Sequence, residues 1–280
     1  MNAIKMTDNE FGKFRDFIQA ELGIKMPPAK KTLLESRLQK RLRLLGLKSF
    51  GYYCDYLFSP GGIDNELVHM IDLVTTNKTD FFRESHHFEV LYQSVLPELV
   101  RHGAGTREQL RVWSAGCSTG EEPYTIAIVL NEFAQAHPEP GLDYSILGTD
   151  ISTRVLECAS RGIYGEDRVA PIPLSLRRKY LLRNKDKERP LVKISPELMS
   201  KVEFKRLNFM DEVFRQPEAM DIVFCRNVII YFDKYTQEKL FRKFAGCMKP
   251  GSFLFIGHSE TLAGFDLPFI KMGQALYRKI

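Results

Sequence analysis

Residues 112–120 read Val-Trp-Ser-Ala-Gly-Cys-Ser-Thr-Gly, a short apolar run followed by a loop with glycine at positions 116 and 120. The apolar run predicts a buried strand over 112–115. A helix is expected next, from about Pro123 to Ala136. A strand, a glycine-bounded loop and a helix in this order are the building unit of an open α/β sheet.

The same alternation continues toward the C-terminus. Further strands are predicted at 144–147, 202–207, 221–225 and 252–257. Helices are predicted at 152–159, with Ser152 as N-cap, and at 236–248. Strands separated by helical crossovers predict a parallel, doubly wound, Rossmann-like sheet. Four prolines and the short strand 191–194 interrupt the pattern, so we expect an inserted β subdomain at about 162–200.

The N-terminal part of the chain is predicted to be entirely helical. Thr7 followed by Glu10 is a capping box, and Pro27-Pro28 is typical of a helix start. Helices are expected over about 8–22, 28–45, 52–57 and 64–74, with a break at 59–62 and Asp64 as the last N-cap. One more helical pattern covers 88–100. We therefore predict a helical domain (1–75), a connecting segment (76–109) and a sheet domain (110–280).

Composition narrows the class of protein. The 280 residues are 44% hydrophobic and 27% charged, which excludes disordered and collagen-like chains. No run approaches the roughly 18 to 20 apolar residues of a membrane span, and the N-terminus has no signal-peptide pattern, so we expect a soluble cytoplasmic protein. The five cysteines are scattered, as is typical of reduced thiols. His86 and His87 would point apart on a helix, so no metal site is predicted.

The positive charge is concentrated in one segment. Between Lys25 and Lys48 there are eight Lys or Arg residues and one Glu, a net charge of +7, whereas the whole chain carries +5. The remainder is therefore net −2. On charge alone, a solvated helix face is the commoner explanation of such a segment, and a docking surface is the alternative.

The loop at 116–120 and Asp150 together indicate a ligand. Open α/β sheets bind ligands at the carboxyl ends of their strands, where glycine lets the backbone approach closely. The loop is not a P-loop and lacks Gly-x-Gly-x-x-Gly. Asp150 can accept hydrogen bonds from both ribose hydroxyls of an adenosine. A tight turn and a helix cap are the simpler alternatives, although Ser152 could cap that helix alone. Loop and carboxylate favour an adenosine ligand without phosphates, of which S-adenosyl-L-methionine is the commonest.

Four stretches together carry a family resemblance. They are Thr76–Arg83 (TNKTDFFR), Trp113–Tyr124 (WSAGCSTGEEPY), Phe224–Phe232 (FCRNVIIYF) and Gly257–Glu260 (GHSE). In content and order they resemble the CheR family, the bacterial chemoreceptor glutamate methyltransferases, over essentially the whole chain. The resemblance implies an S-adenosylmethionine-dependent methyltransferase sheet with an N-terminal all-helical domain and an inserted small antiparallel β subdomain.

The resemblance also implies a reaction and its residues. A methyl group would pass to glutamates on the cytoplasmic helical hairpin of methyl-accepting chemoreceptors, with S-adenosyl-L-homocysteine as product. The implied cofactor-binding residues are Asn77, Thr79, Arg83, Gly116, Glu122, Asp150, Asn208, Phe209, Asn227 and Val228. Arg83 and Tyr231 are the catalytic candidates, because they can hold the substrate carboxylate. That carboxylate is ionised at neutral pH and already nucleophilic, so no general base or metal is expected.

With receptor methylation as the expected activity, the basic segment acquires a role. We expect it to dock on acidic receptor helices through Arg37, Lys40 and Arg41. We favour direct docking over tethering to the receptor's C-terminal peptide, because 183–190 lacks the glycine-containing turn of many family members. We expect a monomer recruited to membrane receptor arrays, without direct membrane insertion.

Two alternatives stay open beside that expectation. One is an RNA or DNA methyltransferase, which the fold class and a pI of about 8.8 allow, although no aromatic residues are interleaved with the basic run. For this reason no nucleic-acid partner is expected. The other is a non-catalytic module that only senses S-adenosylmethionine or its product. The presence of Arg83 and Tyr231 favours an enzyme over such a module.

Overall fold

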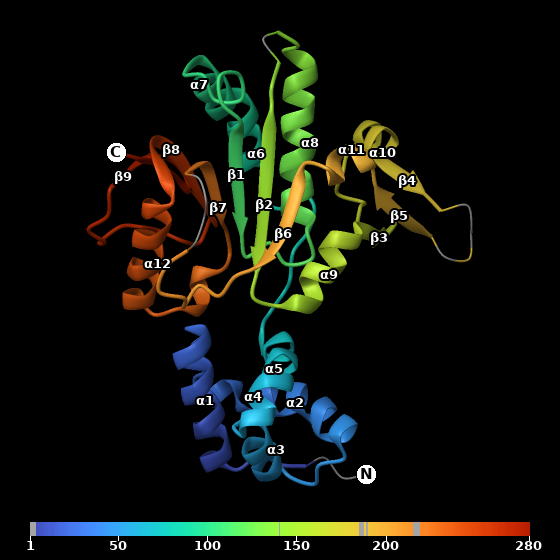
Figure 1. Cartoon of the computed structure of the whole chain (residues 1–280), viewed down its shortest axis with the longest axis vertical. Coiled ribbons are helices and arrows are strands. Elements are labelled where there is room, and N and C mark those ends of the chain that lie inside the picture. Colours follow the sequence, from blue (N-terminus) through green and yellow to red (C-terminus); the bar gives the residue numbers. More distant parts are fainter. Residues whose placement is uncertain (1–3, 140, 185–187, 189, 215–218) are drawn as a thin grey trace.

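The computed structural model describes residues 4–139, 141–184, 188, 190–214 and 219–280, apart from the side chain of Asp64. A helical domain lies below an α/β domain in Figure 1, and an extended segment connects the two. No helix in these ranges is both long and apolar enough to cross a membrane.

The N-terminal domain is built from α1 (Asp8–Leu22), a 3-10 turn (Pro28–Lys30), α2 (Lys31–Leu45), α3 (Phe50–Leu57), α4 (Pro60–Asn65) and α5 (Leu67–Val74). The predicted capping box is confirmed. The Thr7 hydroxyl accepts from the Glu10 N–H, and the Glu10 carboxylate accepts from the Thr7 N–H. The helices share one apolar core, which includes Phe14, Leu34 and Tyr53.

The break predicted at 59–62 is confirmed at Ser59, which lies between α3 and α4, but is wrong for residues 60–62, which are helical. Ser59 is the N-cap of α4, because its hydroxyl accepts from the Gly62 N–H at 3.2 Å and Pro60 fits the first helical turn. Asp64 lies inside α4, so its assignment as an N-cap is also wrong. The next helix, α5, starts after the buried Glu66.

The connecting segment is extended at first and then helical. It continues as α6 (His86–Val90), a π-helical turn η2 (Leu91–Val95) and α7 (Leu96–Arg101). These three pieces follow one another without a gap, which confirms the helical pattern predicted for 88–100.

The α/β domain contains, within the described residues, a seven-stranded sheet of order β6-β2-β1-β7-β8-β10-β9. Its strands are β1 (Leu110–Ala115), β2 (Tyr144–Asp150), β6 (Val202–Arg206), β7 (Met220–Cys225), β8 (Met248–Ile256), β9 (Phe269–Gly273) and β10 (Leu276–Lys279). The five strands from β6 to β8 are parallel, as predicted. The prediction of a wholly parallel sheet is wrong at the C-terminal edge, where β10 pairs antiparallel with β8 and β9. A short turn at 274–275 joins β9 to β10, so no helical crossover is needed between them.

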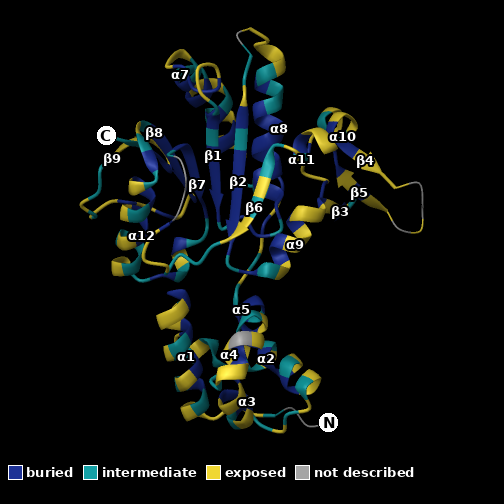
Figure 2. Ribbon diagram, viewed as in Figure 1, coloured by how far each residue is buried: buried dark blue, intermediate teal, exposed yellow. Residues whose placement is uncertain are grey.

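Helices cover both faces of this sheet. They are α8 (Glu121–Ala136), α9 (Thr153–Arg161) and α12 (Lys234–Gly246). Side chains of β1 point alternately to the two faces. Val112 packs with α8 and the α6–α7 segment, whereas Trp113 packs with α12. The central strands β1, β2 and β7 are consequently almost entirely buried in Figure 2.

The predicted insertion lies between α9 and β6. It consists of β3 (Ile163–Gly165), α10 (Leu174–Tyr180), β4 (Leu181–Arg183), β5 (Leu191–Ile194) and α11 (Pro196–Met199). The three strands form an antiparallel sheet of order β3-β5-β4, and β5 confirms the strand expected at 191–194. The stretch 183–190, considered above for receptor tethering, lies partly outside the described residues.

Candidate active site between the sheet and the helical domain

A cleft lies where the carboxyl ends of β1, β2 and β7 face the helical domain. One wall comes from the sheet domain and the connecting segment, and the other from α1, α2 and the turn between them. The cleft is lined by every predicted cofactor-binding and catalytic residue: Asn77, Thr79, Arg83, Gly116, Glu122, Asp150, Asn208, Phe209, Asn227, Val228 and Tyr231. The fold therefore brings together residues from five separate segments of the chain.

The loop after β1 requires glycine at position 116. Gly116 has φ +83°, and a Cβ there would lie 2.6 Å from Cγ2 of Val228. Any larger residue would push Val228 aside and narrow the cleft. The loop is also fixed by the inserted subdomain, since the Tyr164 hydroxyl donates to the Thr119 carbonyl at 2.7 Å.

Asp150 ties this loop to β2. Its Oδ2 accepts from the Ser118 N–H at 2.9 Å, and its Oδ1 accepts from the Ser152 N–H at 3.0 Å. Burial raises the pKa of Asp150 despite these backbone donors. Ser152 caps α9 with its own hydroxyl, so Asp150 is more than a helix cap. Both carboxylate oxygens keep lone pairs for further donors in the cleft.

The connecting segment is held from both domains. The Ser118 hydroxyl donates to the Asn77 carbonyl at 2.9 Å, and Arg168 of the insertion donates to the Thr79 carbonyl at 3.0 Å. From the helical domain, the Arg37 guanidinium donates to the Val74 carbonyl at 2.7 Å and also to Thr75 and Thr76. Residues 74–79 are therefore clamped between the two domains.

Arg83 lies in a strained turn. The residues on either side of it, Phe82 and Glu84, have φ values of +53° and +56°. Each such non-glycine residue costs roughly 1 to 3 kcal/mol and persists only where the surroundings hold it. The Phe82 N–H donates to the Thr125 hydroxyl at 3.2 Å, and Arg226 donates to the Arg83 carbonyl. The Arg83 guanidinium donates to the Lys78 carbonyl at 2.9 Å.

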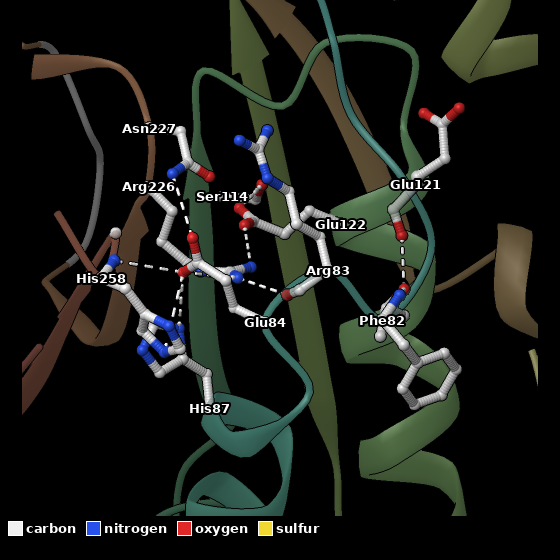
Figure 3. A network of polar contacts seen from close by, with 12 residues as sticks. Phe82, Arg83, Glu84, His87, Ser114, Glu121, Glu122, Arg226, Asn227 and His258 are labelled. Carbon is white, nitrogen blue, oxygen red and sulfur yellow. Dashed lines mark hydrogen bonds and ion pairs between the residues drawn. The ribbon is translucent and has the colours of Figure 1, made fainter. Parts of the chain in front are cut away.

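Two carboxylates, Glu84 and Glu122, hold the buried Arg226 (Figure 3). No role for Arg226 or Glu84 was predicted from the sequence. The Arg226 side chain is 2% exposed. Its Nη1 donates to Glu122 Oε2 at 2.8 Å, and its Nη2 lies 3.2 Å from Glu84 Oε2. Glu84 Oε1 accepts from Asn227 Nδ2 at 3.1 Å. Burial alone would raise the pKa of Glu84, but Asn227 and Arg226 lower it below its ordinary value.

Two histidines lie against the same carboxylate. His87 Nδ1 is 3.6 Å and His258 Nε2 is 4.0 Å from Glu84 Oε2. The His87 ring is buried, and neither ring nitrogen has a hydrogen-bond partner in the described chain. Burial, followed by the Arg226 charge, lowers the pKa of His87 to about 3. This is the one His/Cys/Asp/Glu group with metal-ligand spacing among the described residues, but the Arg226 guanidinium already occupies its carboxylate and opposes a second cation.

The loop after β7 is shaped by Glu260. This buried carboxylate accepts from the N–H groups of Asn227 at 3.0 Å, Ile229 at 3.1 Å and Gly257 at 2.5 Å. Asn227 has φ +59°, so the loop turns sharply into the 3-10 turn that carries Tyr231. The Tyr231 carbonyl accepts from the Lys25 N–H at 2.9 Å, which joins this loop to the helical domain.

Asn208 lines the cleft and is also held by two hydrogen bonds within the protein. Its Nδ2 donates to the Glu21 carbonyl at 2.8 Å, and its Oδ1 accepts from the Met210 N–H at 3.0 Å. Phe209 follows it and packs against Phe214 and Phe244. Asn208 therefore fixes the loop to α1, while Phe209 contributes an apolar wall.

The three docking candidates differ in their environments. Arg41 pairs with the buried Glu66 through Nε–Oε1 (2.8 Å) and Nη2–Oε2 (2.5 Å) contacts. Arg37 holds the connecting segment, as described above, and Lys40 is exposed. Arg37 and Arg41 therefore make contacts within the protein, whereas Lys40 is exposed, and docking through the three residues stays a prediction.

Comparison with known proteins places this architecture in a family. Residues 77–277 match the family model described as CheR methyltransferase, SAM binding domain, and residues 9–75 match CheR methyltransferase, all-alpha domain. The chain belongs to the CheR methyltransferase family. Its cofactor is S-adenosyl-L-methionine, as the resemblance implied.

Full-length relatives of this CheR member are chemotaxis enzymes. It is 42% identical to the chemotaxis protein methyltransferase of Borreliella burgdorferi over 93% of this chain and 91% of the relative. It is 36% identical to that of Escherichia coli over 98% of this chain and 92% of the relative. The solved glycopeptide N-methyltransferase MtfA complexed with (S)-adenosyl-L-methionine is 11% identical, covers 76% of this chain and 66% of its own, and has a TM-score of 0.38.

The CheR cleft suits this cofactor on its own geometry. Gly116 leaves room that a Cβ would fill, and Asp150 offers buried acceptors to ligand hydroxyls. The carboxylate of Glu122 also lines the cleft. Acceptors of this kind match the hydroxyl and ammonium donors of S-adenosylmethionine.

Proposed function

We propose that this CheR member transfers a methyl group from S-adenosyl-L-methionine to the side-chain carboxylates of specific glutamates in the cytoplasmic helices of chemoreceptors. The products would be glutamyl methyl esters and S-adenosyl-L-homocysteine. The observation that carries the proposal is the shared cleft, in which Arg83 and Tyr231 line the same space as Gly116 and Asp150. A reacting carboxylate and a cofactor can therefore meet there.

The sheet wall would hold the cofactor, which supplies an electrophilic methyl group on a sulfonium centre. Asp150 would accept hydrogen bonds from the ribose hydroxyls, since its oxygens are fixed by two backbone donors. Asn77 and Thr79 would contribute through the clamped connecting segment, and Val228 and Phe209 through apolar contact. Gly116 would allow close backbone approach.

The helical wall and the Arg83 turn would orient the substrate. A glutamate carboxylate with a pKa near 4.3 is about 99% ionised at pH 7, so a carboxylate oxygen can attack directly. An oxygen–carbon bond forms as the carbon–sulfur bond breaks, and both charges disappear. What the protein must supply is alignment and exclusion of water. Arg83 can hold the carboxylate through two N–H donors, and Tyr231 can add one O–H donor.

Docking would use the exposed cations of α2. Lys40 and Arg43 are exposed, and Lys30 and Arg37 of the same region line the cleft, so positive charge extends from the cleft along the helix. Receptor methylation helices rich in acidic residues would be attracted to this surface. The proposal includes a cytoplasmic monomer recruited to receptor arrays.

Methylation with radiolabelled S-adenosylmethionine tests the activity. The chain is incubated with candidate chemoreceptors, and the label should be released by base, as expected of a methyl ester. Label on RNA or DNA instead would support a nucleic-acid methyltransferase. Binding of the cofactor with no transfer to any receptor would support a sensing module.

Tyr231→Phe tests the assignment of the transfer site. The variant should bind S-adenosylhomocysteine within about threefold of the wild type, because the ring is kept. Receptor methylation should fall at least about tenfold, the effect of one hydrogen bond in the transition state. Full methylation by this variant would make Tyr231 a packing residue and leave Arg83 as the remaining candidate.

A further inference from the structure

We propose that Glu84 is a positioning residue for methyl transfer, because its carboxylate sets which end of the Asn227 amide faces the cleft and fixes the Arg83 turn through Arg226. The inference deepens the proposed function and rests on it for the identity of the substrate. Glu84 follows Arg83 in the chain but, unlike Arg83, does not line the cleft.

The Glu84 carboxylate joins three segments that are distant in the chain (Figure 3). Its Oε1 accepts from Asn227 Nδ2 at 3.1 Å. Its Oε2 accepts from Arg226 Nη2 at 3.2 Å and from the His258 N–H at 3.3 Å. An ionised carboxylate only accepts hydrogen bonds, so all three contacts require donors on the partner side. The connecting segment, the β7 loop and the β8 loop are thereby held at one point.

This contact decides the orientation of the Asn227 amide. An asparagine side chain has one end that donates and one that accepts, and the two ends have nearly the same shape. Because Nδ2 is bound to Glu84, Oδ1 is the end that Asn227 can offer to a ligand in the cleft. An amide oxygen attracts positive charge. The cofactor of this family carries a sulfonium and an ammonium group, so the orientation imposed by Glu84 suits it.

The same carboxylate supports the strained turn that carries Arg83. Arg226 is shared between Glu84 and Glu122, and its Nη2 also donates to the Arg83 carbonyl. Glu84 and Asn227 both have positive φ, so each needs a contact that holds it. Loss of the Glu84 charge would leave Arg226 paired with one carboxylate, Glu122, instead of two and would weaken the support of the turn. Glu84 thus acts on the cofactor through Asn227, and on the substrate carboxylate through Arg226 and the Arg83 turn.

Two substitutions at Glu84 separate the effect of its charge from the effect of its side-chain length. Glu84→Gln keeps the length but replaces one oxygen by an NH2 group, which then faces the donor of either Asn227 or Arg226. Glu84→Asp keeps the charge but is one carbon shorter, so it cannot bridge both partners. The matched control is Glu89→Gln on the same segment, since Glu89 is exposed and its contact is with His86. Isothermal titration calorimetry with S-adenosylmethionine and with S-adenosylhomocysteine, receptor methylation rates and thermal unfolding are measured for each.

In Glu84→Gln the affinity for S-adenosylmethionine should fall about tenfold, and that for S-adenosylhomocysteine about threefold or less. The second ligand lacks the sulfonium charge that the Asn227 oxygen favours. The turnover number at saturating cofactor should fall at least about tenfold in both Glu84 variants, and Glu89→Gln should match the wild type. If Glu84 were purely structural, its substitution would lower the melting temperature and reduce the affinity for both ligands equally. That result would overturn the proposal.

Asn227→Ala provides a second route if Glu84→Gln does not fold. It leaves the Glu84–Arg226 pair in place and should show the same selective loss of S-adenosylmethionine over S-adenosylhomocysteine. Equal losses for the two ligands would contradict the proposed amide orientation. The calorimetric comparison needs no receptor. It can therefore succeed even if the wild type methylates no chemoreceptor, which would overturn the proposed function alone.

Discussion

The two walls of the cleft hold their charged side chains in different ways. On the sheet wall Asp150 and Arg226 are buried, and each is bound by at least two fixed partners. On the helical wall Lys30 is partly exposed, and its Nζ lies 5.6 Å from the centre of the Tyr231 ring and 3.5 Å from the Lys25 carbonyl oxygen, two long contacts. Farther along α2, Lys40 and Arg43 are exposed.

The difference fits two kinds of ligand. A small cofactor needs several donors and acceptors fixed to within a fraction of an ångström, which buried, saturated groups provide. The proposed receptor would present several related sites on its helices, and exposed surface cations could follow them without a single fixed geometry. The contrast therefore predicts large effects from substitutions of buried groups and small ones from exposed cations.

The largest effect is expected from Arg41, which departs from this contrast because it neutralises a buried carboxylate, Glu66, within the helical domain. Arg41→Ala would leave Glu66, whose side chain is 2% exposed, with Tyr53 as a neutral donor. We expect a loss of about 3 kcal/mol in the free energy of unfolding, since a buried charge without its partner is costly. Urea denaturation measures this loss. Lys40→Ala is the control, with an expected change below about 0.5 kcal/mol, and similar values for the two would contradict the structural role of Arg41.

Substitution of Asp150 should have the largest effect on the affinity for the cofactor. Asp150→Ala removes an acceptor of two backbone N–H groups and of the proposed ribose contacts. Calorimetry should show about a hundredfold weaker binding of S-adenosylhomocysteine, equal to about 2.7 kcal/mol. Asp150→Asn keeps one acceptor oxygen and should lie between this variant and the wild type. An unchanged affinity in the folded alanine variant would place the cofactor elsewhere.

His87 should make the stability of the sheet domain depend on pH. Its pKa is lowered to about 3, with Arg226, Glu84, His258 and His86 as the charged groups around it. The neutral ring is thus favoured by the fold, so this contribution to stability is complete above pH 6.5 and is lost as the pH falls from 6.5 toward 3. Between pH 7.5 and 5 the loss should be about 2 kcal/mol.

His87→Phe isolates that contribution. The aromatic ring is kept against Phe255, but nothing titrates at this position. Denaturation curves at both pH values should show a pH-dependent loss about 2 kcal/mol smaller in the variant. The same loss in both proteins would show that another group carries the pH dependence.

The sequence predicted the parallel part of the fold mainly because its central strands, β1, β2 and β7, are almost entirely buried and therefore mostly apolar. It missed β9 and β10, and for β9 the reason is the opposite. β9 is an edge strand with residues 270–273 exposed, so neither an apolar run nor an alternating pattern marks it. The extent of the break at 59–62 was misjudged because Ser-Pro-Gly-Gly is typical of a turn, yet Ser59-Pro60 also forms a good helix start.

The candidate site could be predicted only where residues lie in motifs. Gly116 directly follows β1 and Asp150 is the last residue of β2. The alternation of strands and helices therefore predicted that the two residues lie close together at the same edge of the sheet. Glu84, Arg226 and His258 lie in separate segments, and their pairing is a property of the tertiary structure. Arg226 stood within a quoted motif but had no assigned role, because a sequence does not show which of its cations become buried. For the same reason Arg37 and Arg41 were assigned to a surface.

The smallest effect is expected from the exposed cations of α2, and it sharpens the contrast between the walls. Lys40→Glu with Arg43→Glu changes two exposed residues that make no contact with the cleft. At physiological ionic strength we expect receptor methylation to slow about fourfold, or about 0.8 kcal/mol, through slower association. At high salt the double variant and the wild type should converge, because surface attraction is screened there. Cofactor affinity should be unchanged. The control is Arg101→Glu with Lys271→Glu, which makes the same change in net charge on exposed residues of α7 and β9. If that control slows methylation equally, the effect belongs to net charge, and α2 is a solvated face.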